Sequence, residues 1–200
     1  GYRVGICEQM EDPKAAKGIV KRDIIQIISK GTFMNDDALI ECENNYVGSI
    51  MDFGHLYAIA YADISTGESY VLKVEHNASK LVSEVVNIGL KEVVVNDKLE
   101  SNIVNILKDQ FKITVTVFND IMDIDEYKYI YEDISDIYYV QVLKYLLTYI
   151  TTTQKRNLSH LQHVIVKENK NYLKMDIHTK RNLELTETLR LKQRNYSLIW

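Results

Sequence analysis

The sequence has few cysteines and no long apolar run, and both scarcities exclude classes of protein. Its two cysteines, Cys7 and Cys42, are too few for a disulfide framework, and neither belongs to a Cys-x-x-Cys pair. This usage favours a reducing compartment, so we expect a cytoplasmic protein. No run approaches the roughly 20 apolar residues that span a bilayer, and the chain does not open with the charged-then-apolar pattern of a signal peptide. We therefore expect a soluble chain without a membrane partner.

Positive charge is not in excess either. The 24 Lys and Arg residues face 28 Asp and Glu residues, which gives a formal net charge of −4. A dedicated nucleic-acid-binding module normally carries a strong positive excess, so any contact of this chain with DNA must be local. The apolar fraction of 46% is nevertheless enough to build a core, and we expect a folded chain.

The common catalytic signatures are missing. The sequence contains no GxxxxGK[ST] loop, no HExxH and no GxSxG. His160 and His163 have a spacing that suits a metal, but no second pair of ligands is near, so we interpret them as a surface or helix-end pair. Cys7 lies on an expected strand, and we expect it to be buried and inert. No catalytic, cofactor-binding or metal-binding residue is assigned.

Extended runs and helical patterns follow one another in a definite order through the middle of the chain. Three extended runs, YVGSIMDF, LYAIAYAD and ESYVLKV, are joined by short breaks at Gly54-His55 and Ser65-Thr66-Gly67, which predicts an antiparallel meander. The sequence then predicts a helix over 79–88, a buried strand over 92–96, a helix around 103–107 and an alternating strand over 112–118. The order β-β-β-α-β-α-β is that of the ribonuclease-H-like fold, an α/β mixed sheet flanked by helices.

The regions on either side of this unit are less regular. Residues 2–8 and 20–29 predict two strands around one helical turn, a unit too small to fold alone. Residues 119–136 are rich in acids and are predicted to be a solvated connection. From residue 155 basic residues outnumber acids, and the sequence predicts a strand over 172–177 and a helix from 179.

A strong amphipathic helix is predicted over 137–152, with Ser135 or Asp136 as its cap. Its apolar face carries Tyr139, Leu143, Leu146, Leu147 and Ile150. We interpret this face as core packing, with a partner-binding surface as the alternative.

Asp63 ends an expected strand beside the Ser-Thr-Gly turn, where a nuclease would hold a metal ion. A two-metal nuclease needs several converging carboxylates, since the metals must hold both the attacking and the leaving oxygen. Glu68 lies across the turn, but the fourth strand offers only Asp97 at its far end. We interpret Asp63 as a turn-forming acid. A metal-dependent ribonuclease-H-like nuclease that uses Asp63 and Glu68 is the alternative.

Several strings in the sequence resemble those of one known family. They are RVGICEQMEDPKAAKGIVKRDIIQIISKGT, YAIAYADISTGE, LLTYITTTQKRNLSHL and MDIHTKRNLELTETLR. In this order the strings resemble the MutS family of DNA mismatch-repair ATPases. The resemblance implies that residues 1–32 are the tail of the mismatch-recognition domain, 33–174 a connector domain with a non-catalytic ribonuclease-H-like fold, and 175–200 the start of the core and lever domain. Ser29-Lys30-Gly31-Thr32 departs from the Thr-Pro-Gly-Thr that is usual in the family.

The resemblance also implies a function. Because the sequence opens on Gly1 inside an expected strand and stops at Trp200, we expect a piece of a longer protein. The family's mismatch wedge and its ATPase would then lie outside the sequence, so we expect no enzyme activity and no cofactor in the piece, and ATP and Mg²⁺ in the whole protein. The connector is expected to couple the ATPase to the DNA clamp and to dock a MutL-type protein. Mismatched duplex DNA and a second copy, in a homodimer, are the other expected partners of the whole protein.

Overall fold

The computed structural model describes residues 4–10, 20–28, 45–154 and 158–167. The chain divides into two compact units, Gly1–Glu168 and Asn169–Trp200. All of the described residues belong to the first unit, and the description below is of that unit alone.

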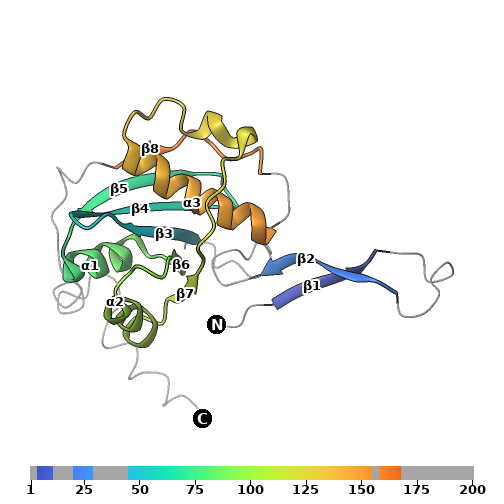
Figure 1. The fold of residues 1–200 in the computed structure, drawn as a ribbon, viewed down its shortest axis with the longest axis horizontal. Coiled ribbons are helices and arrows are strands. Elements are labelled where there is room, and N and C mark those ends of the chain that lie inside the picture. Colours follow the sequence, from blue (N-terminus) through green and yellow to red (C-terminus); the bar gives the residue numbers. More distant parts are fainter. Residues whose placement is uncertain (1–3, 11–19, 29–44, 155–157, 168–200) are drawn as a thin grey trace, which may run out of the picture. The chain divides into compact units, whose positions relative to one another are not determined.

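A six-stranded mixed sheet forms the centre of the first unit (Figure 1). Its strands are β3 (Tyr46–Asp52), β4 (Leu56–Asp63), β5 (Ser69–Glu75), β6 (Glu92–Val95), β7 (Thr114–Val117) and β8 (Ile165–Val166). They lie in the order β7-β6-β3-β4-β5-β8. β4 pairs antiparallel with β3 and β5, whereas the β3–β6, β6–β7 and β5–β8 pairs are parallel. The predicted mixed α/β class is confirmed.

Both predicted hairpins are present. β3 and β4 are joined at Gly54, and β4 and β5 at a turn that ends in Gly67, with φ angles of 80° and 79°. These positive angles are easily adopted by glycine, which has no Cβ, and the two glycines therefore allow the tight reversals.

The helices begin and end close to the predicted positions. α1 (Ala78–Ile88) is capped by Asn77, whose side chain accepts a hydrogen bond of 3.0 Å from the Lys80 N–H. α2 (Ser101–Asn105) continues as a short π-helical segment, η2 (Ile106–Gln110). α3 (Ile137–Gln154) is the longest helix of the described residues. The helices predicted over 79–88 and 137–152 are thus confirmed.

The two faces of the sheet are covered by different helices, and β4 shows this most clearly. Ala58, Ala60 and Ala62 belong to the core under α3, whereas Tyr57, Ile59 and Tyr61 belong to the core under α1 and α2 (Figure 1). Successive side chains of a strand point to opposite faces, and here both faces are buried. This explains why LYAIAYAD is apolar without alternation.

The prediction of a solvated connection over 119–136 is wrong in part. Residues Asp125–Ile130 form a 3₁₀ helix, η3, between exposed acids. Tyr127 and Ile130 within it are only 3% and 1% exposed and pack in the core under α3. Tyr127 and Ile130, which lie between the acids, thus anchor this segment to the core of the domain.

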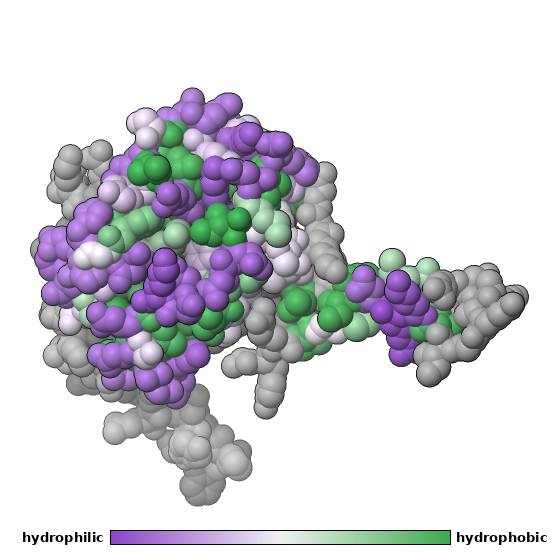
Figure 2. All heavy atoms as spheres, viewed as in Figure 1, coloured by the Kyte–Doolittle hydropathy of each residue, from purple (hydrophilic) through white to green (hydrophobic). Residues whose placement is uncertain are grey.

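The prediction of a buried Cys7 is also wrong. β1 (Val4–Gln9) pairs antiparallel with β2 (Arg22–Ile28) in a separate two-stranded sheet, and Cys7 is exposed. All six residues of β1 are exposed, because β2 is its only strand partner within the described ranges and neither face of β1 is covered there. Apolar surface therefore gathers on this hairpin, at Val4, Ile6 and Ile24, whereas the visible face of the body is largely hydrophilic with separate apolar patches (Figure 2).

Some predictions fall on residues outside the described ranges. They are the helical turn near Pro13, the turn Ser29–Thr32, the strand over 172–177 and the helix from 179.

Candidate functional site

The turn between β4 and β5 holds Asp63 as a structural acid. The residue is 3% exposed. Oδ1 accepts hydrogen bonds from the Ser65 hydroxyl and from the Ser65 N–H at 2.9 Å, and Oδ2 accepts one from the Asn45 N–H at 3.2 Å. The Gly67 N–H donates to the Asp63 carbonyl at 2.9 Å, which closes the turn. The interpretation of Asp63 as a turn-forming residue is confirmed.

Glu68, the second acid of the nuclease alternative, faces a different neighbour. Its Oε2 accepts a hydrogen bond of 2.9 Å from the Tyr70 hydroxyl. Within the described residues, no group of three or more His, Cys, Asp and Glu side chains gathers to hold a metal ion. Since each of the two acids is engaged by protein groups of its own, the nuclease alternative is not favoured.

Tyr70 belongs to a cluster of tyrosines beside this turn. Its ring stacks on Tyr61 at a centroid distance of 5.0 Å, and Tyr46 contacts Tyr61 edge-on at 5.1 Å. The Lys167 ammonium lies 4.3 Å from the centroid of Tyr70, which suits a cation–π contact. Burial, followed by the hydrogen bond and the charge of Glu68, raises the pKa of Tyr70 to about 12.

The two histidines of the His-x-x-His pattern contact different parts of the domain. His160 Nε2 lies 2.7 Å from the Ile64 carbonyl oxygen, so this ring is hydrogen-bonded to the β4–β5 turn. His163 Nδ1 lies 3.8 Å from Asp133 Oδ2 and is largely exposed. The spacing that suggested a pair of ligands therefore corresponds to two separate contacts.

Glu92 is a buried acid that sequence reasoning did not single out. It opens β6 and is fully buried in the core. Its Oε1 accepts hydrogen bonds from the Tyr149 hydroxyl at 2.6 Å and from the Thr116 hydroxyl at 3.1 Å. The group links β6 and β7 to α3. A charged residue that opens a run expected to be buried requires hydrogen-bond donors, and this was the available signal.

Asp136 caps α3 and also meets Lys73 of β5. Its Oδ1 accepts a 3.0 Å hydrogen bond from the Tyr138 N–H, and Oδ2 forms an ion pair with Lys73. Burial acts to raise the pKa of Asp136, but the hydrogen bonds from Lys73 and Tyr138 and the charge of Lys73 outweigh it, so the pKa is lowered overall. Of the two predicted caps, Ser135 and Asp136, the structure assigns Asp136.

The apolar face predicted for α3 packs against the sheet. Its buried members are Leu143, Leu146, Leu147 and Ile150. Tyr139 is partly buried, and its ring lies 4.7 Å from the Lys73 ammonium. The interpretation as core packing is confirmed.

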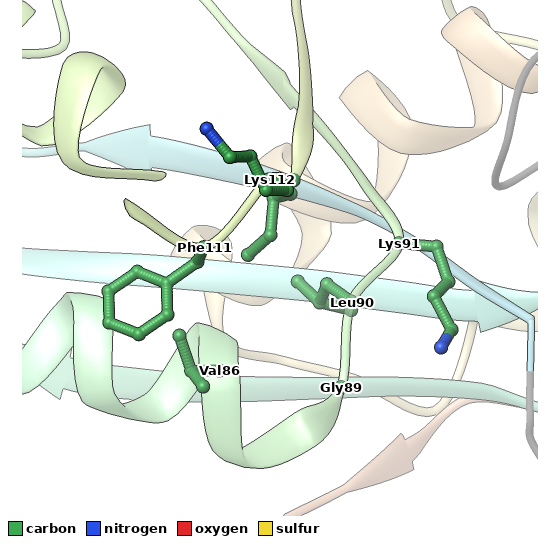
Figure 3. A pocket seen from close by; sticks show the side chains of 7 residues that line it. Val86, Gly89, Leu90, Lys91, Phe111 and Lys112 are labelled. Atoms are coloured by element: carbon green, nitrogen blue, oxygen red, sulfur yellow. The ribbon is translucent and has the colours of Figure 1, made fainter. Parts of the chain in front are cut away.

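A small pocket of about 210 Å³ opens between the end of α1 and the segment before β7 (Figure 3). Its lining residues are Val86, Gly89, Leu90, Lys91, Phe111, Lys112 and Ile113. The apolar side chains face one another across the pocket, while the ammonium groups of Lys91 and Lys112 point in different directions (Figure 3). A ligand site usually has a few polar groups that converge on the ligand, and the two lysines of this pocket do not converge.

Within the described residues, no helix is both long enough and apolar enough to cross a bilayer.

Comparison with known proteins gives consistent matches along the chain. Residues 45–162 match the family model of MutS domain II, and residues 1–37 match that of MutS domain I. The chain is 40% identical over 201 residues to the DNA mismatch repair protein MutS of Oceanobacillus iheyensis. It is 40% identical over 200 residues to that of Bacillus subtilis and 39% identical over 202 residues to that of Listeria monocytogenes. These alignments cover 100% of the chain and 23% of each relative, so the chain spans less than a quarter of their length.

A similarity to a solved structure is much weaker. The catalytic core domain of BIV integrase aligns with 56% of the chain and 85% of its own length, at 10% identity and a TM-score of 0.29. A similarity at this level carries no argument about the chain.

Proposed function

The chain belongs to the MutS family, and from this membership we propose that it forms the connecting part of a DNA mismatch-repair ATPase. One observation carries the proposal. The segment that matches MutS domain II, residues 45–162, coincides with the folded body that runs from β3 through α3. In that body the acids that suggested chemistry are engaged in structure, which fits a domain that acts through its shape and its contacts.

We propose a ribonuclease-H-like fold for this domain. An antiparallel meander, β3-β4-β5, is extended on the β3 side by the parallel strands β6 and β7, and this arrangement supports the assignment. The proposed domain boundaries are 1–32 for the tail of the mismatch-recognition domain, 33–174 for the connector and 175–200 for the start of the core and lever domain. The matches to MutS domain I over 1–37 and to domain II over 45–162 support two successive domains, and the domain I match extends five residues beyond the proposed boundary at 32.

The proposed role is to couple an ATPase to a DNA clamp and to offer a docking surface for a MutL-type protein. The whole protein would bind mismatched duplex DNA, act as a homodimer and work in the cytoplasm. This chain contains no GxxxxGK[ST] loop, so ATP and Mg²⁺ would bind in another part of the protein. The relatives are named DNA mismatch repair proteins, which supports the mismatch-repair assignment.

Exchange of domain II in a relative tests the proposal. Residues 45–162 replace the matched segment of the Bacillus subtilis MutS protein, and the chimaera is expressed in a strain without its own MutS protein. We expect the chimaera to lower the spontaneous mutation frequency toward that of the parent strain. A chimaera with Ile59→Asp, which places a charge at a fully buried core position, is the control and should fail. A well-folded chimaera that leaves the mutation frequency at the level of the strain without MutS contradicts the proposal.

A nuclease assay addresses the alternative directly. We expect the wild-type chain to leave duplex DNA and RNA–DNA hybrids intact in the presence of Mg²⁺ or Mn²⁺. Metal-dependent cleavage by the wild type, lost in Asp63→Asn, would establish the nuclease.

A further inference from the structure

Residues 158–167, here called the strap, follow α3 and run between two parts of the domain. On one side lie the β4–β5 turn and β5, and on the other lies η3. The strap ends in β8, which pairs with β5 at the edge of the sheet. It is the last described segment before Glu168, where the first compact unit ends.

The β4–β5 turn contacts the strap through hydrogen bonds and a close approach of the two main chains. The Gln162 N–H donates to the Gly67 carbonyl at 2.8 Å, and His160 Nε2 lies 2.7 Å from the Ile64 carbonyl oxygen. Gly67 itself is in close contact with the strap, since a Cβ at this position would lie 2.3 Å from the His160 carbonyl oxygen. Because the contact is with main chain, a larger residue could be accepted only if the strap moved away.

η3 holds the strap from the other side. The Tyr129 hydroxyl donates to the Leu161 carbonyl at 2.9 Å, and the Val164 N–H donates to the Ile130 carbonyl at 2.9 Å. At the start of the strap the Leu158 N–H donates to the Tyr127 hydroxyl at 3.2 Å. η3, which lies within the acid-rich segment 119–136, thus holds one side of the strap.

Few apolar contacts accompany these hydrogen bonds. Leu158 and Leu161 are buried in the core and the partly buried Val164 packs against it, whereas Ile165 and Val166 of β8 are 53% and 39% exposed. β8 has two residues and one strand partner within the described ranges, while β4 pairs along its length on both sides. Segments with few buried apolar contacts and edge hydrogen bonds open at a lower free energy than central strands.

We propose that the strap is a conformational device that detaches from the domain as one unit while the rest of the sheet and α3 stay folded. Closure depends on Gly67, which lets the β4–β5 turn approach the strap. Opening removes β8 from β5 and frees the edge of that strand. It also releases the chain immediately before the second compact unit.

Hydrogen exchange on the 200-residue chain tests the proposal. The reporters are the amides of Gln162, Val164 and Lys167, which donate to Gly67, Ile130 and Val71, and the comparison is with amides of β4. In the wild type we expect the three reporters to share one opening free energy and to exchange at least about tenfold faster than the β4 amides. Equal protection of the strap and β4 would overturn the proposal.

Two glycine variants separate closure of the strap from backbone strain. Gly67→Ala adds the clash with His160 and the cost of a positive φ, whereas Gly54→Ala, with a φ of 80° and nothing within 4 Å of the new Cβ, adds only that cost. We expect Gly67→Ala to abolish protection of the three reporters while β4 exchanges as in Gly54→Ala. If the reporters of the two variants are equally protected, the proposal is wrong.

A milder variant keeps the test independent of the turn. Tyr129→Phe removes the hydrogen bond to the Leu161 carbonyl and leaves the β4–β5 turn unchanged. We expect it to speed exchange of all three reporters together, several-fold, without a change at β4. Faster exchange at one reporter alone would show that the strap does not open as a unit.

Discussion

Asp63 and Glu92 are buried carboxylates that are held by N–H and O–H donors of the protein. A buried charge is tolerated only where hydrogen bonds replace the water that it loses, and both residues meet that requirement. The donors in turn depend on the acids, because removing an acceptor leaves buried donors without a partner. The effects of substitution at these positions should therefore appear first in stability.

Replacement of Asp63 by Ala should destabilise the chain by about 1–3 kcal/mol, because the N–H groups of Asn45 and Ser65 lose their acceptor. Asp63→Asn should cost less, since its amide oxygen can still accept one of these bonds. Urea unfolding followed by circular dichroism measures the difference. The control is Asp120→Ala, an exposed acid for which we expect a change within about 0.5 kcal/mol. Equal losses at the two positions would contradict the role assigned to Asp63.

Two tyrosines of the same core give a matched comparison. Tyr149→Phe should lower the free energy of unfolding by about 1–3 kcal/mol, because Glu92 loses a buried donor. Tyr131→Phe should be neutral or stabilising, because the Tyr131 hydroxyl is buried and has no hydrogen-bond partner among the described residues. The measurement is urea unfolding of both variants. A greater loss in Tyr131→Phe than in Tyr149→Phe would show that the hydrogen bond to Glu92 contributes little.

Asp63 and Glu92 also show which contacts can be predicted from neighbouring residues in the sequence. The turn role of Asp63 could be predicted, because its partners lie mostly within the next few residues. The partners of Glu92 could not, since Thr116 and Tyr149 are 24 and 57 residues away along the chain. Only the fold brings such donors to one acid.

At the scale of elements, the predictable ones are those in which local pattern and burial agree. β4 could be predicted because its apolar run suits a strand that is covered on both faces. In the structure all of its residues after Leu56 are buried. η3 was missed because its two buried residues stand among acids, and β8 because two residues carry no periodic pattern. Both missed elements depend on contacts with distant strands and helices.

The start of α3 gives a prediction at this scale. Asp136→Ala should cost about 0.5–2 kcal/mol, because the helix loses its cap at Tyr138. Ser135→Ala is the control, since Ser135 is exposed and Asp136 already occupies the cap, and it should change stability little. Urea unfolding at pH 7 measures both. A larger effect at Ser135 would move the cap to that residue.

The lowered pKa of Asp136 adds a dependence on pH. A carboxyl whose pKa is lower in the folded state stabilises the fold above its unfolded pKa of about 3.9, and this contribution is lost as pH falls through the folded value. The stability difference between the wild type and Asp136→Asn should therefore be largest near neutral pH and shrink below pH about 4. Unfolding curves at a series of pH values measure it. A difference that is independent of pH would show that the charge of Asp136 contributes nothing.

At the scale of the whole domain, the central sheet separates two cores, and each contains buried tyrosines. Tyr61 lies in the core under α1 and α2, and Tyr145 in the core under α3. Burial raises the pKa of Tyr61 and of Tyr145, because the phenolate would have to give up its hydration. The sequence indicated one sheet with helices, but the size and depth of these two cores depend on how α1 and α3 lie over it.

Raised tyrosine pKa values make the domain sensitive to alkali. A folded state that holds protons more tightly than the unfolded chain gains stability that is fully present below pH about 10, the usual pKa of tyrosine, and is lost as pH rises through the folded values. Tyr70, with a pKa of about 12, is one of these groups, and burial also raises the pKa of Tyr57, Tyr61, Tyr129 and Tyr145. Above pH about 10 we expect the circular dichroism signal of the folded state to fall while the absorbance of tyrosinate rises, and both changes should occur over the same pH range.

Substitution of Glu68 tests the contribution of Tyr70. The hydrogen bond and the charge of Glu68 contribute to the raised pKa of Tyr70, so Glu68→Gln should let Tyr70 ionise at lower pH than in the wild type. Glu132→Gln, at an exposed acid, is the control and should leave the titration unchanged. Absorbance of tyrosinate against pH measures all three proteins. If Glu68→Gln titrates as the wild type does, burial alone accounts for the raised pKa, and the contact between Glu68 and Tyr70 adds nothing to the alkaline stability of the domain.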